Sequence, residues 1–184
     1  RDRGREGRPC DRAAGRQDRD GQRRQPRGLL TSEPAAGPTL VEALGGRDLV
    51  VDERLTGVTD HGEIADVELD GCVLDACDLE GLTWRRVVLR ECRIIGCNLS
   101  RVRFVDTRLV DCVIEGGKAL GVGWSGARLS EMATVPLHLV DVRVDFGSFT
   151  GMPLRGARLI RCSAREADFT DADLREADLT GAVL

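Results

Sequence analysis

Apolar positions recur along the chain with a period of five residues. Every fifth residue from Ile64 to Leu184 has a large apolar side chain, except Ala119, Thr134 and Ala164. A second series, two residues before each of these centres, holds only small or apolar residues. Neither series contains a charged residue, so charges are confined to the other three positions of each repeat. This segregation predicts two inward-facing and three outward-facing positions per repeat.

A period of five suits neither an α-helix nor a flat strand. It fits one side of a coil that turns a corner at every repeat and pairs with the coils above and below it, about 4.8 Å away. Such corners need permissive backbone, and glycine is frequent two residues after the centre. The glycines at this position are Gly71, Gly81, Gly96, Gly116, Gly121, Gly126, Gly151, Gly156 and Gly181.

The repeats resemble a known family. Cys77-Asp78-Leu79, Cys97-Asn98-Leu99 and the three triplets that begin at Ala167, Ala172 and Ala177 are similar to the A-(D/N)-L-x-x motif of pentapeptide repeat proteins. The resemblance covers about residues 60–184. It implies an all-β fold, a right-handed quadrilateral parallel β-helix with four repeats per coil and about six coils.

Four repeats per coil mean that residues twenty apart should stack. Reading every twentieth residue places Trp84, Phe104 and Trp124 on one wall. The same reading places Cys72, Cys92 and Cys112 on one wall, and Cys77 and Cys97 on the next. The residues expected to form the structural core are Leu69, Leu74, Leu79, Trp84, Leu89, Leu99, Phe104, Leu109, Trp124, Phe149, Phe169, Leu174 and Leu179.

Three parts are expected along the chain. Residues 1–38 are an arginine-rich tail and linker, predicted to be disordered. Their interspersed acidic residues favour a linker over a polyanion-binding arm. Residues 39–59 form an N-terminal cap, in which Thr39 and Glu42 match a capping box before a helix at 40–44. The helix should lead into a strand and plug the first coil of the repeat helix at 60–184.

Two stretches fit the repeat less well. They are residues 116–124, which are rich in glycine, and residues 130–139, where Pro136 falls at a corner. Both are compatible with a local bulge or a loop. We interpret them as ordinary drift of the repeat rather than as binding loops.

The cysteines follow the repeat rather than a metal-binding pattern. Six of the seven lie in the inward small series, and the spacing typical of zinc sites is missing. We therefore expect small apolar side chains that fill a narrow core, with no metal and no intrachain disulfide. Buried free thiols favour a reducing cytoplasm.

The sequence contains no recognisable catalytic arrangement. His61 and His138 do not accompany a nucleophile, and His138 should face solvent just before a centre. Asp168, Asp173 and Asp178 look like a carboxylate row, but successive repeats should place them on different walls. No glycine-rich phosphate loop is present. We predict a protein that is not an enzyme, with no cofactor and no catalytic residues.

Outward charges alternate in sign along the chain. Residues 60–80 and 166–178 are mainly acidic, whereas residues 85–108 are rich in arginine. Because about twenty residues make one coil, these segments predict acidic and basic collars. We interpret these collars as a charged, solvated surface, and the alternative is that the basic collar is an interaction surface. The candidate residues of that interaction surface are Arg85, Arg86, Arg90, Arg93, Arg101, Arg103 and Arg108.

These observations favour a non-catalytic scaffold or protein-interaction module. The expected partner is another protein, and a homodimer through an open coil end at Leu184 is an alternative. No stretch approaches the roughly 20 apolar residues of a membrane span. The family resemblance also implies a second function, a DNA mimic that protects topoisomerases such as gyrase. The arginines of 85–108 interrupt the continuous negative surface that this function needs, so it ranks second. Direct nucleic-acid binding is not predicted.

Overall fold

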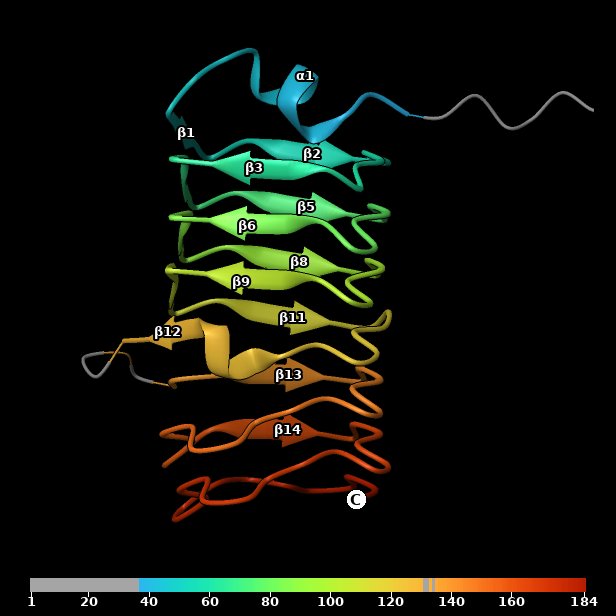
Figure 1. The fold of residues 1–184 in the computed structure, drawn as a ribbon, viewed down its shortest axis with the longest axis vertical. Coiled ribbons are helices and arrows are strands. Elements are labelled where there is room, and N and C mark those ends of the chain that lie inside the picture. The colour runs from blue at the N-terminus through green and yellow to red at the C-terminus, as the bar shows by residue number, and fades with distance from the viewer. Residues whose placement is uncertain (1–36, 131–132, 134) are drawn as a thin grey trace, which may run out of the picture. The chain divides into compact units, whose positions relative to one another are not determined.

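The computed structural model describes residues 37–130, 133 and 135–184. The predicted disorder of the tail therefore falls almost entirely outside the described residues. The elements are short and nearly all are strands (Figure 1). They are α1 (Leu40–Leu44), β1 (Leu49–Val51), β2 (Arg54–Thr56), β3 (Glu63–Ala65), β4 (Glu68–Asp70), β5 (Val73–Asp75), β6 (Thr83–Arg85), β7 (Val88–Arg90), β8 (Arg93–Ile95), β9 (Arg103–Val105), β10 (Thr107–Val110), β11 (Val113–Glu115), η1 (Trp124–Gly126), β12 (Ala127–Leu129), β13 (His138–Val140) and β14 (Arg158–Ile160).

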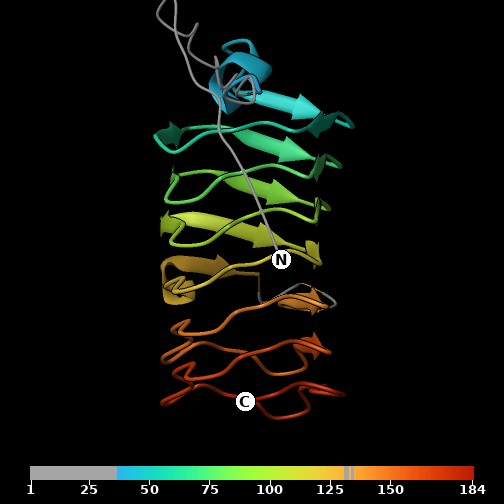
Figure 2. The same cartoon turned by 90° about the vertical axis from the view of Figure 1, so that its right-hand side faces the viewer.

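The strands stack as the walls of a parallel β-solenoid. One wall is the sheet β1-β4-β7-β10-β12, a second is β14-β13-β11-β8-β5-β2, and a third is β3-β6-β9. Isolated parallel bridges join the fourth wall, including those from Asp78 to Asn98 and from Asn98 to Lys118. Figure 2 shows the same stack of coils from the side. The predicted all-β solenoid fold is confirmed, and its tallest sheet has six strands.

The corners explain the position of glycine in the repeat. Eight of the nine glycines named above have φ between 61° and 73°, the left-handed conformation. Gly126 differs because it ends the short 3-10 helix η1. Other residues adopt the same conformation at corners, including Asp66 with φ of 58° and Arg86 with φ of 53°. The corner is therefore imposed by stacking, even where the side chain makes it costly.

The stacking register is twenty residues over most of the solenoid. Leu69, Leu89, Leu109 and Leu129 follow one another on one wall. Between β11 and β13 the register becomes 25, since Ile114 pairs with Leu139. Five extra residues therefore lie between β12 and β13. The uniform period of twenty was therefore wrong here, and the poor fit of residues 130–139 to the repeat marks an insertion of one repeat length. Thr134, expected to point inward, lies outside the described residues.

The insertion extends the aromatic stack beyond the three residues expected. Trp84, Phe104 and Trp124 are followed by Phe149 and Phe169, because the longer coil brings Phe149 under Trp124. Successive ring centroids are 6.1, 5.7, 5.7 and 4.8 Å apart. The last two contacts are stacked, with interplanar angles of 7° and 3°. A continuous aromatic column thus fills one wall of the core.

The N-terminal helix α1 caps the first coil (Figure 1). Thr39 accepts a hydrogen bond from the backbone of Glu42, whose carboxylate accepts one from the Thr39 backbone. Gly45 ends the helix with φ of 61°. Leu40 and Leu44 are buried and belong to the same core as the repeat centres. At the other end, Phe169, Leu174 and Leu179 are half-buried rather than buried.

Candidate interaction surface

Seven arginines form what we call the arginine belt: Arg85, Arg86, Arg90, Arg93, Arg101, Arg103 and Arg108. They lie in strands β6 to β10 or at the corners between them, with their side chains outward. The expected outward position is clear at Arg108, which is exposed, while its neighbour Leu109 is 4% exposed. The belt therefore runs around the walls rather than along one of them.

Most of the belt is neutralised by carboxylates on adjoining coils. Arg85 pairs with Glu63 at 2.8 Å, Arg86 with Asp66 at 2.6 Å, and Arg90 with Glu68 at 2.9 Å. Arg93 pairs with Glu115 at 2.9 Å, and Arg101 pairs with Glu80. The acidic and basic collars thus face each other across neighbouring coils. Ion pairs between the two collars therefore neutralise much of the charge of the arginine belt.

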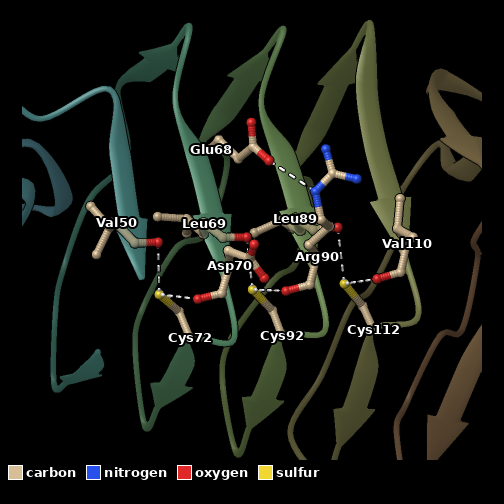
Figure 3. A network of polar contacts seen from close by, with 10 residues as sticks. All are labelled: Val50, Glu68, Leu69, Asp70, Cys72, Leu89, Arg90, Cys92, Val110 and Cys112. Carbon is tan, nitrogen blue, oxygen red and sulfur yellow. Dashed lines mark hydrogen bonds and ion pairs between the residues drawn. The ribbon is translucent and has the colours of Figure 1, made fainter. Parts of the chain in front are cut away.

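The pairs follow a simple geometric rule. In the belt, partners that both lie on strands are 22 residues apart, so the two side chains meet diagonally across adjacent strands, as Arg90 and Glu68 do in Figure 3. The pairs of the corner residues Arg86 and Arg101 have spacings of 20 and 21. The hydrogen bond from Arg85 lowers the pKa of Glu63, and that from Arg86 lowers the pKa of Asp66. Sequence reasoning missed these partners, although a search for opposite charges at this spacing would have found them.

Two members of the belt differ from the others. Arg103 and Arg108 form no ion pair within the described part of the chain. The diagonal position, 22 residues further on, is Ser125 for Arg103 and Ser130 for Arg108. Arg93, which like them comes just before a repeat centre, finds Glu115 at this position, so a serine stands where Arg93 finds a carboxylate. These two guanidinium groups remain available for an external anion.

Near the C-terminal end the carboxylates are also occupied by local partners. Asp173 binds Arg175 at 2.6 Å, and this hydrogen bond lowers the pKa of Asp173 to about 2. Asp168 accepts hydrogen bonds from Thr150 and from the backbone of Thr170. As expected, these carboxylates do not converge, since Asp168 bridges to Ser148 and Asp178 to Arg158, on different walls.

The inward cysteines form a ladder of thiol contacts (Figure 3). The Sγ atoms of Cys72, Cys92 and Cys112 lie 3.2 to 3.5 Å from backbone carbonyl oxygens of their own coil and the preceding one. All six cysteines in the described residues are free and buried. Burial raises the pKa of the Cys162 thiol. The arrangement suits packing, with each thiol donating to a carbonyl group.

The described residues contain no group of three or more His, Cys, Asp or Glu side chains placed to hold a metal ion. His138, expected to face solvent, is half-buried on β13. Burial lowers its pKa, and Arg158 on the neighbouring strand acts in the same direction. Within the same residues no helix is long and apolar enough to cross a membrane.

Comparisons with known proteins agree with this architecture. The family model for pentapeptide repeats matches in eight copies, over residues 68–109 and 153–184. Residues 68–109 and 153–184 therefore consist of pentapeptide repeats. No curated protein matches it.

Solved structures share the fold at low sequence identity. A trypsin-treated variant of QnrB1, a plasmid-mediated fluoroquinolone resistance protein, is 18% identical over 73% of this chain and 71% of its own, with a TM-score of 0.50. The pentapeptide repeat protein Rfr23 from the cyanobacterium Cyanothece 51142 is 14% identical over 78% of this chain and 95% of its own, with a TM-score of 0.39. At such identities the likeness concerns the fold alone.

Proposed function

We propose that the protein is a non-catalytic scaffold that binds another protein through its outward walls. The observation that carries this proposal is the fixed lattice of outward side chains. Stacked strands hold these side chains about 4.8 Å apart, and the diagonal ion pairs restrain long arginines that would otherwise move freely. A surface ordered before binding loses less conformational entropy when a partner docks.

The pattern of charge favours a protein over a nucleic acid as partner. Binding to a phosphate backbone depends on many unpaired Lys and Arg side chains. In the arginine belt, five of seven guanidinium groups already pair with carboxylates of this chain. A surface of mixed and locally balanced charge suits the polar rim of a protein interface. We also place the protein in the cytoplasm, because its six buried thiols are free.

Gyrase protection is the second candidate, since QnrB1 is a fluoroquinolone resistance protein of similar fold. DNA mimicry would need acidic side chains along most of one wall. On the wall built by β4, β7 and β10, Glu68 is followed by Arg90 and Arg108. A supercoiling assay with gyrase and a fluoroquinolone tests this candidate. If the protein at a concentration equal to that of gyrase preserves supercoiling in the presence of the drug, gyrase protection becomes the favoured function.

Photocrosslinking tests the scaffold proposal wall by wall. A photoreactive residue would replace one outward side chain per wall, such as Val73, Thr83, Val88 or Asn98, in cells that produce the protein. We expect a defined crosslinked protein from one or two walls. The proposal is wrong if no wall gives a defined product. Sedimentation of the purified protein shows whether the chain associates with itself. Self-association through the half-buried Phe169, Leu174 and Leu179 would mean that the crosslinked partner is a second copy of the chain.

A further inference from the structure

A surface recess of about 510 Å³ lies beside β9, next to the unpaired Arg103. Its lining includes Arg101, Phe104, Gly121 and Gly123. The recess exists because two positions on the following coil lack side chains. A Cβ atom added to Gly121 or Gly123 would meet nothing within 4 Å, so this side is open to solvent.

The recess also uncovers part of the aromatic column. Trp84 and Trp124 are 2% and 0% exposed, whereas Phe104 between them is half-buried. On this wall the following coil pairs with β9 only through the bridge from Arg103 to Gly123, and the chain then enters η1. The floor of the recess is therefore apolar and aromatic, and its rim carries guanidinium groups.

The two arginines at the rim have different electrostatic environments. Arg101 pairs with Glu80, whose pKa is lowered by hydrogen bonds from Asn98 and Arg101. Arg103 forms no ion pair with any described residue, and its diagonal position holds Ser125. An unpaired guanidinium beside an apolar surface favours an anion that has an apolar group attached to it.

We propose that this recess binds a segment of a protein partner that carries a carboxylate next to an aromatic residue. The carboxylate contacts Arg103, and the aromatic ring packs on Phe104. A protein segment fits better than an enclosed small molecule, because ligand pockets usually bury most of their ligand and this recess is open. The inference rests on the proposed scaffold function and names the chemistry of its partner.

The test uses two probes, acetyl-Phe-Glu-amide and its Gln counterpart, titrated into the full chain. The side-chain Nε–H resonances of arginine are followed by nuclear magnetic resonance. We expect a saturable shift at Arg103 with a dissociation constant of about 1 mM for the Glu peptide. The Gln peptide should bind about fivefold more weakly, as expected for loss of one exposed charge pair.

Variants provide matched controls. Arg103→Ala should weaken binding about fivefold, while Arg108→Ala, which removes the other unpaired arginine of the belt, should leave it unchanged. Ser125→Glu should also weaken binding, because it supplies the missing diagonal carboxylate. Equal binding of the two peptides, or equal effects of Arg103→Ala and Arg108→Ala, would overturn the proposal.

The scaffold proposal can fail separately from this one. If crosslinking identifies a partner and Arg103→Ala leaves that crosslink intact, the scaffold stands and the recess is not its docking site. If no wall yields a crosslink, the scaffold proposal fails. The peptide titration then still decides whether the recess recognises this chemistry.

Discussion

Each residue of the repeat has a role set by the direction of its side chain. Leu109 points inward and is 4% exposed, whereas the adjacent Arg108 is exposed. Cys92 points inward two residues after Arg90 and donates to the carbonyl oxygen of Leu69. Neighbours in sequence can therefore differ completely in what they contribute to stability.

Leu109→Asp should destabilise the protein far more than Arg108→Asp. The first change buries a carboxylate without a partner, which costs more than about 4 kcal/mol. The second alters an exposed side chain, and such changes stay within about 0.5 kcal/mol. Urea melts of both variants beside the parent measure the difference. Equal midpoints would show that the inward and outward positions are misassigned.

The inward thiols should be unreactive in the native protein. Burial raises the pKa of Cys162, whereas the contact with Cys97 lowers the pKa of Cys77 to about 7. All six described thiols are nevertheless buried, so a reagent cannot reach them in the folded protein. The experiment uses a Cys10→Ser variant, because Cys10 lies outside the described residues. A thiol reagent should find six sulfhydryls in urea and almost none without it. Rapid labelling of the folded variant would contradict this expectation.

At the scale of elements, stability comes from columns that pass through several coils. The aromatic column joins five coils through ring contacts, and the diagonal ion pairs join neighbouring strands on the outside. No single strand of three residues could be stable alone. Each strand depends on the coils on either side of it.

Phe149→Ala should cost about 3 to 5 kcal/mol, because it leaves a cavity between Trp124 and Phe169. Phe149 is fully buried and stacks on both rings. Phe146→Ala is a matched control, since Phe146 is 60% exposed at a corner. Its replacement should change stability by no more than about 0.5 kcal/mol. Thermal and urea unfolding compare the two variants, and similar losses would argue against the aromatic column.

Ion pairs at the corners and between near neighbours in sequence predict a loss of stability in acid. Hydrogen bonds from Arg86, Arg161 and Arg175 lower the pKa values of Asp66, Asp141 and Asp173, the last to about 2. The unfolded carboxylates have a pKa of about 3.9, so in acid the unfolded state binds more protons. The stabilisation is complete above this value and is lost as the pH falls toward about 2.

Urea midpoints across this range of pH measure the effect. His138, whose pKa is lowered, adds a smaller loss as the pH falls below about 6.5. The double variant Arg86→Gln and Arg161→Gln should flatten the acidic part of the profile. An unchanged profile in that variant would show that these pairs do not contribute.

At the scale of the whole solenoid, one insertion interrupts a stack that is regular from β3 onward. The register of 25 between β11 and β13 leaves the inward phase intact, since the extra length is one repeat. The coils after it therefore continue the same walls. The solenoid accommodates five added residues between β12 and β13. We expect it to be more sensitive to deletions that move every later residue to a different wall.

Deletion of residues 131–135 should leave the fold intact, because it restores the register of twenty. We expect the melting temperature to change by less than about 4 °C, equivalent to about 1 kcal/mol. Deletion of residues 95–99 is the control of equal length. This deletion places every later repeat on the neighbouring wall and so separates Trp84 from Phe104. The melting temperature should therefore fall by about 10 °C or more. A larger fall in melting temperature after deletion of 131–135 than after deletion of 95–99 would refute the register of 25.

The sequence by itself determined the repeat, its phase and therefore the fold. Two inward series without charge, from Ile64 to Leu184, admit few structures other than a solenoid, because burying charge is costly. The capping box of Thr39 and Glu42 likewise fixed the position of helix α1. These features are local, so they can be recognised one repeat at a time.

Only the tertiary structure decided which residues face one another across coils. Phe149 joins the aromatic column, and Arg90 finds Glu68, through contacts between residues about twenty positions apart. A five-residue insertion preserves the inward phase, so the sequence pattern could not reveal that the register had moved to 25. For the same reason the pattern grouped seven arginines as one basic surface. Stacking pairs five of them with acids and leaves Arg103 beside an open recess.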